Sequence, residues 1–122
     1  LSLYSKRVTA IEINAKYVKL AEENFLKAKC DNIEIIHGNA LDVLKTFNGK
    51  FDIILIDATK SQYKNYLELS LNLLNKNGLI FVDNTISHKG SMQDFFYYLK
   101  KSSLYFVELN IGNGLMMISI SH

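Results

Sequence analysis

The strongest constraint on the fold is a regular alternation of short apolar runs with helical patterns. The clearest run, Phe51–Ile56, ends in four consecutive branched apolar residues and is followed by Asp57. Such a run is typical of a strand that is buried on both faces, as in the centre of a parallel sheet. Further strands are predicted at residues 8–13, 33–36, 79–82, 105–109 and 115–120.

Apolar residues at helical spacing predict helices between these strands, over residues 16–29 and 61–76. Asn14 is expected to cap the first helix, and Asn77-Gly78 to end the second. A third helix is predicted from an apolar stripe at the same kind of spacing, which consists of Met92, Phe95, Phe96 and Leu99. This alternation predicts an α/β fold, an open sheet with helices on both faces, in a single domain over residues 1–122.

Composition excludes several classes of protein. The chain has 14 basic and 12 acidic residues, and a net charge of +2 does not by itself argue for nucleic-acid binding. No apolar run approaches the roughly 18 residues of a membrane span. The lone Cys30 excludes a disulfide framework and fits a reducing compartment, so we expect a cytoplasmic protein.

Acidic residues lie at the ends of three of the predicted strands. Glu12 lies near the end of the first, Asp57 follows Phe51–Ile56, and Asp83 comes before Asn84. In open α/β sheets, ligands bind beyond the carboxyl ends of the strands, and an acidic residue after an early strand can bind a ribose. Asp57, Asp83 and Asn84 are hard oxygen ligands that suit magnesium or calcium. The alternative is that each residue caps the following helix or turn.

Lys60 is a candidate general base, because a nearby divalent cation lowers the pKa of a lysine amine. The ordinary alternative is a solvated lysine at a helix start. Tyr63 and Tyr66 are expected in the helix core, and His37 as a satisfied strand-end histidine. His88 follows Asp83-Asn84 in a polar loop from which it could reach the same site.

The order of motifs resembles a known enzyme family. The motifs are Val8–Ile13, Gly38-Asn39-Ala40, Asp57-Ala58-Thr59-Lys60-Ser61-Gln62-Tyr63, Asp83-Asn84 and Gly112-Asn113-Gly114-Leu115. Together they resemble the metal-dependent S-adenosylmethionine (SAM) O-methyltransferases, which include catechol and caffeoyl-CoA O-methyltransferases. The resemblance extends over nearly the whole chain and implies a Rossmann-like methyltransferase sheet.

The resemblance also implies roles for individual residues. Glu12 would bind the cofactor ribose, and residues 38–40 would bind the cofactor too, with Asn39 and Ala40 beside the adenine. Asp57, Asp83 and Asn84 would hold Mg²⁺ or a similar ion, with Asp57 also near the cofactor and Lys60 as the base. A metal-acidified hydroxyl would then attack the sulfonium methyl in line.

The chain departs from the family pattern in several places. Asn39 and Asn113 stand where the family commonly has Asp, and the loop at Ser87-His88 is less aromatic than expected. The family's first strand and glycine-rich loop would precede Leu1. Without them, the sheet would have a slot between residues 8–13 and 51–56, and we expect no complete cofactor site unless a preceding segment or another chain fills it.

Two further interpretations remain open. One is an aminopropyltransferase of the same fold, although Lys60, Tyr63 and the Asp83-Asn84 pair favour the methyltransferase. The other is an inactive α/β fragment that acts as an interaction module. For the methyltransferase, the acceptor is expected to be a small phenol or a tRNA hydroxyuridine, and the protein is expected to be a homodimer.

Overall fold

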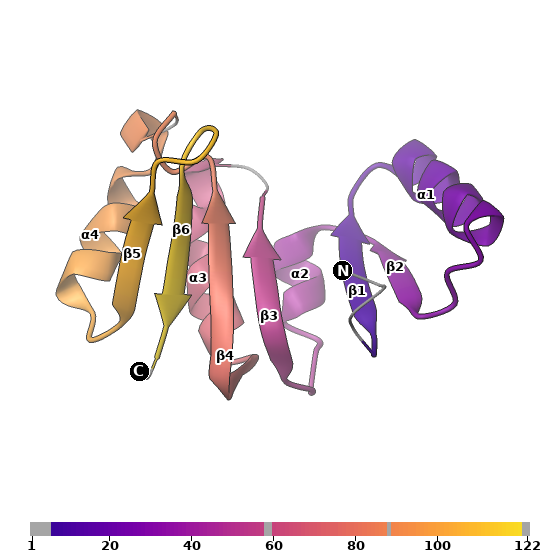
Figure 1. Cartoon of the computed structure of the whole chain (residues 1–122), viewed down its shortest axis with the longest axis horizontal. Coiled ribbons are helices and arrows are strands. Elements are labelled where there is room, and N and C mark those ends of the chain that lie inside the picture. The colour runs from indigo at the N-terminus through magenta and orange to yellow at the C-terminus, as the bar shows by residue number, and fades with distance from the viewer. Residues whose placement is uncertain (1–5, 58–59, 88, 121–122) are drawn as a thin grey trace. The chain divides into compact units, whose positions relative to one another are not determined.

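A computed structural model describes residues 6–57, 60–87 and 89–120, without the side chains of Lys60 and Lys89. The chain forms two compact units, residues 1–46 and 47–122 (Figure 1). The first unit contains β1 (Val8–Glu12), α1 (Ala15–Lys27), β2 (Ile33–His37) and α2 (Ala40–Leu44). The second contains β3 (Phe51–Ile56), η1 (Lys60–Gln62), α3 (Tyr63–Leu71), β4 (Leu74–Asp83), η2 (Lys89–Ser91), α4 (Gln93–Lys101), β5 (Tyr105–Leu109) and β6 (Leu115–Ser119).

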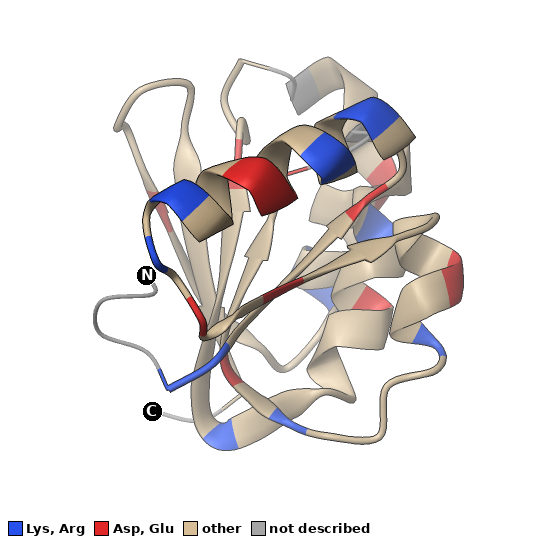
Figure 2. Cartoon of the chain, turned by 90° about the vertical axis from the view of Figure 1, so that its right-hand side faces the viewer, with Lys and Arg blue, Asp and Glu red and all other residues tan. Residues whose placement is uncertain are grey.

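In the first unit, β1 and β2 pair in parallel along their whole length. Asn14 caps α1 as predicted, since its side chain accepts a hydrogen bond from the backbone N–H of Lys16 at 2.9 Å. Nε2 of His37 lies 2.9 Å from the carbonyl oxygen of Ile13, so this histidine has a backbone partner at the strand end. No described residue of this unit is fully buried, and Figure 2 shows basic and acidic residues along α1.

The strands of the second unit are hydrogen-bonded in the order β3-β4-β6-β5. β3 and β4 are parallel, whereas β6 runs antiparallel to both β4 and β5. Parallel strands with intervening helices confirm the predicted α/β class. Among the described strands, β1 pairs only with β2, and β3 only with β4. The additional strand expected between β1 and β3 stays a prediction.

The core of the second unit lies between its sheet and the two helices α3 and α4, which are behind the strands in Figure 1. Ile80 and Val82 of β4 are fully buried on this face. Tyr63 of α3 and Phe95 of α4 are also fully buried, and their rings meet edge to face with centroids 6.1 Å apart. Tyr66 is only 6% exposed. The prediction that Tyr63 and Tyr66 belong to the core is therefore confirmed.

The opposite face of this sheet also carries apolar side chains. Strand pairing places Leu55, Phe81, Met117 and Val107 in one row across the four strands. Leu55 is 59% exposed and Val107 is 50% exposed, whereas Phe81 and Met117 are half-buried. Among the described residues, α3 and α4 thus cover the face opposite this row.

The helix predicted over residues 61–76 is shorter than expected, and its predicted end is wrong. α3 ends at Leu71, and β4 already runs through Asn77 and Gly78. A Cβ atom at Gly78 would lie 2.9 Å from the carbonyl oxygen of Asp52, where the pairing of β3 and β4 shifts register. Glycine is therefore required here for the close approach of two strands, and not to end a helix.

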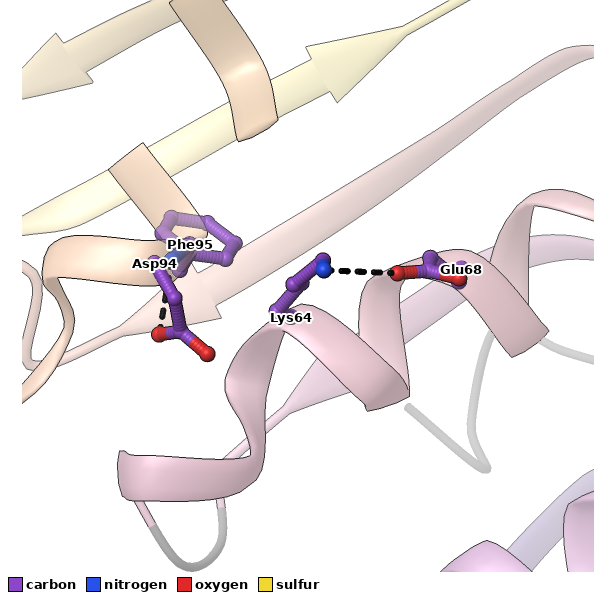
Figure 3. A network of polar contacts seen from close by, with 4 residues as sticks. All are labelled: Lys64, Glu68, Asp94 and Phe95. Atoms are coloured by element: carbon purple, nitrogen blue, oxygen red, sulfur yellow. Dashed lines mark hydrogen bonds and ion pairs between the residues drawn. The ribbon is translucent and has the colours of Figure 1, made fainter. Parts of the chain in front are cut away.

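The surface of α3 and α4 carries local polar contacts (Figure 3). Lys64 Nζ lies 3.7 Å from Glu68 Oε1, one helical turn away on α3. Asp94, in the first turn of α4, accepts a hydrogen bond from the backbone N–H of Phe95 at 2.8 Å. An exposed ion pair such as that of Lys64 and Glu68 contributes about 0.3–0.5 kcal/mol to stability.

None of the described helices has the length and apolar character needed to cross a membrane.

Candidate functional site

Two of the predicted acidic residues lie at the same edge of the second unit's sheet. Asp57 directly follows β3, and Asp83 is the last residue of β4. Because β3 and β4 are parallel and Ile56 pairs with Val82, both carboxylates emerge at neighbouring strand ends. This edge is the one at which open α/β sheets bind their ligands.

Asn84 joins these two carboxylates through hydrogen bonds. Its side-chain Nδ2 donates to Asp57 Oδ1 at 3.2 Å, and its backbone N–H donates to Asp83 Oδ1 at 2.8 Å. Asn84 adopts a left-handed backbone conformation with φ of 64°, which is uncommon for a residue other than glycine. The structure thus brings together all three residues that the sequence predicts as metal ligands.

The chemistry of this group fits a hard cation. Asp57 is exposed and Asp83 is half-buried, so two carboxylates face an edge that solvent can reach. Oxygen-only donor sets of carboxylates and amides suit Mg²⁺ or Ca²⁺. The amide of Asn84 presents its nitrogen to Asp57, and rotation of the amide by 180° exchanges nitrogen for the oxygen that a metal requires.

Only two of the three proposed ligands at this edge, Asp57 and Asp83, are carboxylates. Among the described residues, no group of three or more His, Cys, Asp or Glu side chains is arranged to hold a metal ion. The third member of the predicted set is an amide, so the set contributes two negative charges. Two other residues that the sequence suggests for this edge fall outside what the structure describes, namely the side chain of the candidate base Lys60, which opens η1, and the whole of His88.

The first unit brings together the other predicted residues. The backbone N–H of Gly38 donates to the carbonyl oxygen of Glu12 at 2.9 Å, which joins the ends of β1 and β2. Asn39 caps α2, because its Oδ1 accepts the backbone N–H of Leu41 at 3.0 Å. Ala40 is the first residue of α2. Asn39 therefore has a structural role that the resemblance did not imply.

The Glu12 side chain has one oxygen with a local partner. Oε1 accepts the backbone N–H of Asn14 at 3.2 Å, while the structure gives Oε2 no hydrogen-bond partner among the described residues. Glu12 is half-buried at the carboxyl end of β1. A carboxylate held in this way can accept hydrogen bonds from a bound polyol.

A contact that the sequence did not predict supports the loop carrying Asn84. Backbone N–H groups of Asn84, Ile86 and Ser87 donate to carbonyl oxygens in the turn between β5 and β6, each at 3.0 Å. The acceptors are Asn113 and Gly114. The sequence indicates this turn only as a hairpin connection, because its contact with residues 84–87 depends on strand order and has no local signal.

Comparison with known proteins agrees with the predicted resemblance. Residues 4–110 match the O-methyltransferase family. A catechol O-methyltransferase of Mycobacterium tuberculosis is 33% identical over 90 residues, which cover 72% of this chain and 41% of that protein. The chain thus spans less than half the length of this relative.

Solved structures share the fold. An SAH-bound methyltransferase of Podospora anserina has a TM-score of 0.89 and 24% identity, with 95% of this chain and 61% of that chain covered. An O-methyltransferase of Bacillus cereus in complex with SAH has a TM-score of 0.82 and 24% identity, with 94% and 63% covered. The Rossmann-like methyltransferase fold is therefore confirmed, and by its sequence match the chain belongs to the O-methyltransferase family.

Proposed function

We propose that the protein is a SAM-dependent O-methyltransferase that uses a divalent cation to prepare the hydroxyl group of a small, catechol-like phenol. The observation that carries this proposal is the joining of Asp57, Asp83 and Asn84 at the ends of β3 and β4. A cation-assisted reaction requires oxygen ligands that are gathered at one place, and this edge provides them. The chain also belongs to the O-methyltransferase family.

The cofactor is assigned first to residues of the first unit. Glu12 would accept hydrogen bonds from the ribose hydroxyls, and residues 38–40 would line the adenine. Two structures of the same fold are bound to SAH, the product that remains when SAM has given up its methyl group. A contact between Asp57 and the cofactor is also part of the proposal.

The cation is assigned to Asp57, Asp83 and Asn84. When bound there, a divalent cation supplies Lewis acidity that lowers the pKa of an acceptor hydroxyl. Asp57 and Asp83 would supply the negative charge that retains the ion, and the Asn84 amide a neutral oxygen. Lys60 is the proposed base that takes the acceptor proton. The remaining task of the protein is to align the acceptor oxygen with the sulfonium methyl carbon.

A small phenol is the proposed acceptor because the Mycobacterium tuberculosis relative is a catechol O-methyltransferase. The test supplies the intact protein with methyl-labelled SAM and Mg²⁺, together with either catechol or unfractionated tRNA. We expect label in catechol, at a rate that changes little between low and moderate salt. Label in tRNA that falls steeply with salt would instead identify a nucleic-acid substrate.

Replacing Glu12 with Gln is expected to weaken SAM binding roughly 10- to 100-fold, because hydrogen bonds to a charged acceptor contribute about 1.5–3 kcal/mol. Gln keeps the Oε1 atom that accepts the N–H of Asn14, so the local backbone contact is retained. Isothermal titration of the intact protein with SAM measures the effect.

The matched control for this variant is Glu34→Gln. Glu34 is exposed on β2, so its replacement removes the same charge from the same unit. Its effect on SAM affinity should stay within about twofold because a distant exposed charge is screened by salt. Equal SAM affinities for Glu12→Gln and the unaltered protein would contradict the ribose assignment.

Two other functions are outcomes of the same measurements. Transfer of an aminopropyl group from decarboxylated SAM to a polyamine, without methyl transfer, would identify an aminopropyltransferase. Absence of heat on titration with SAM, with and without Mg²⁺, would support an inactive α/β fragment. We further propose that the protein is cytoplasmic, since a single cysteine fits a reducing compartment. We also propose that it is a homodimer. Light scattering of the intact protein measures its mass in solution, and fractionation of cells measures its location.

A further inference from the structure

We propose that the backbone of Asn113 and Gly114 is a positioning element that holds the Asn84 amide toward Asp57 and thereby sets the affinity of the cation site. This inference rests on the function proposed above. It assigns a role in the site to a turn that belongs to the β5–β6 hairpin and is close to none of the three proposed ligands in the sequence.

Three backbone hydrogen bonds connect this turn to the loop after β4. Asn84 N–H donates to the carbonyl oxygen of Gly114, and the N–H groups of Ile86 and Ser87 both donate to that of Asn113, each at 3.0 Å. The pairing of β4 with β6, in which Asp83 lies opposite Leu115, brings the turn to this position. The loop is thus attached on both sides of Thr85.

The attachment matters because Asn84 has a left-handed backbone conformation, with φ of 64°. Asparagine tolerates this conformation better than most residues, and the hydrogen bonds of the loop select it here over an ordinary φ. The backbone N–H of Asn84 is shared between two acceptors, the carbonyl oxygen of Gly114 and Asp83 Oδ1, and these hold the orientation of the peptide before Asn84. Relaxation to an ordinary φ would turn the side chain away from Asp57, to which it now donates at 3.2 Å.

Only glycine fits at position 114. Its φ is 99°, and a Cβ atom there would overlap the backbone nitrogen of Ile86 and lie 2.7 Å from Ile86 Cγ1. The neighbouring Gly112 also has a positive φ, of 56°, but a Cβ atom there would meet nothing within 4 Å. The same turn therefore contains one glycine that contacts the loop of the site and one that does not.

This difference defines the experiment. Gly114→Ala pushes against the loop that carries Asn84, whereas Gly112→Ala places the same methyl group at a positive φ without touching the loop. We titrate the intact protein and both variants with Mn²⁺ alone, following free Mn²⁺ by electron paramagnetic resonance, and separately with SAM. Thermal unfolding of each variant reports the general cost of the substitution.

We expect Gly114→Ala to weaken Mn²⁺ binding by about 10- to 100-fold, the usual effect of disturbing groups that orient metal ligands. Gly112→Ala should leave Mn²⁺ affinity nearly unchanged, and SAM affinity should be the same in both variants. The inference is overturned if both variants bind Mn²⁺ as tightly as the unaltered protein, or if both lose the same amount of affinity. Either result leaves the proposed function in place. Failure of the unaltered protein to bind Mn²⁺ overturns both.

A second pair of variants decides the question if Gly114→Ala does not fold. Ser87→Pro removes the N–H group that donates to Asn113, and Ser87→Ala keeps it. Ser87 is exposed, so neither change creates a cavity. Weaker Mn²⁺ binding in Ser87→Pro alone supports the positioning role, whereas equal affinities in this pair overturn it.

Discussion

Replacing Asp57 with Asn is expected to lower the rate of cation-dependent methyl transfer by about three orders of magnitude. The reason is that Lewis-acid stabilisation contributes several kcal/mol, and each 1.36 kcal/mol corresponds to roughly a factor of ten in rate. Asn is nearly isosteric and keeps an Oδ1 atom that can accept the hydrogen bond of Asn84. The change therefore removes a negative charge from the proposed cation site with little change in shape.

Transfer of labelled methyl groups from SAM to catechol, measured over a range of Mg²⁺ concentrations, checks this expectation. The variant should need a higher Mg²⁺ concentration for half-maximal rate, because one of two anionic ligands is gone. Removal of divalent cations with a chelator should stop the reaction in the unaltered protein. A variant that keeps full activity at low Mg²⁺ would exclude Asp57 as a ligand.

The same strand provides a matched control. Asp52 lies near the other end of β3, and its Oδ1 accepts a hydrogen bond from Asn75 Nδ2 at 2.7 Å. This pair repeats the chemistry of Asp57 with Asn84, an exposed aspartate beside an asparagine, away from the proposed site. Asp52→Asn should therefore leave methyl transfer and its Mg²⁺ dependence unchanged.

Replacing Phe95 with Ala is expected to lower the free energy of unfolding by about 3–5 kcal/mol, the usual cost of truncating a buried aromatic residue. Phe95 is fully buried on α4, and its ring contacts the ring of Tyr63 edge to face. The cavity would open between α3 and α4 and the sheet. A domain of this size has about 5–15 kcal/mol of stability in total, so the loss is severe.

Tyr97→Ala is the control on the same helix. Tyr97 is 66% exposed, and its contact is with Lys101, whose Nζ lies 5.6 Å from the ring centroid. An exposed contact of this kind contributes about 0.5–1 kcal/mol, so the control should be mild. Urea denaturation followed by circular dichroism measures both variants. Similar losses in both would mean that α4 does not form the core as described.

The strands and the core helices could largely be predicted from the sequence. The run Phe51–Ile56 forms β3 with the predicted bounds, and the apolar stripe that includes Phe95 and Leu99 forms the buried face of α4. Both signals are local, because apolar residues repeat with the period of the element they form. The end of α3 was missed because Asn77-Gly78 has the composition of a helix end but lies within β4.

The prediction of the site was also partly local. The sequence shows that Asp57 and Asp83 follow buried strands, and the carboxyl ends of parallel strands, where such sheets bind ligands, lie at one edge. The sequence could not show that the Asn39 side chain caps α2, since a helix cap and a ligand contact use the same amide oxygen. The side chain of Lys60 lies outside the described part of the chain, so its role stays a prediction.

By itself, the sequence determined which segments become strands, which helix faces are apolar, and which polar residues stand at the strand ends. Only the tertiary structure decided that the Asn84 amide reaches Asp57, 27 residues away, and that the turn at Asn113 and Gly114 supports this loop. The physical reason is that element type depends on the periodicity of neighbouring residues. Contacts between distant residues depend on strand order and register, and hydrogen bonds between backbone groups leave almost no mark on side-chain identity.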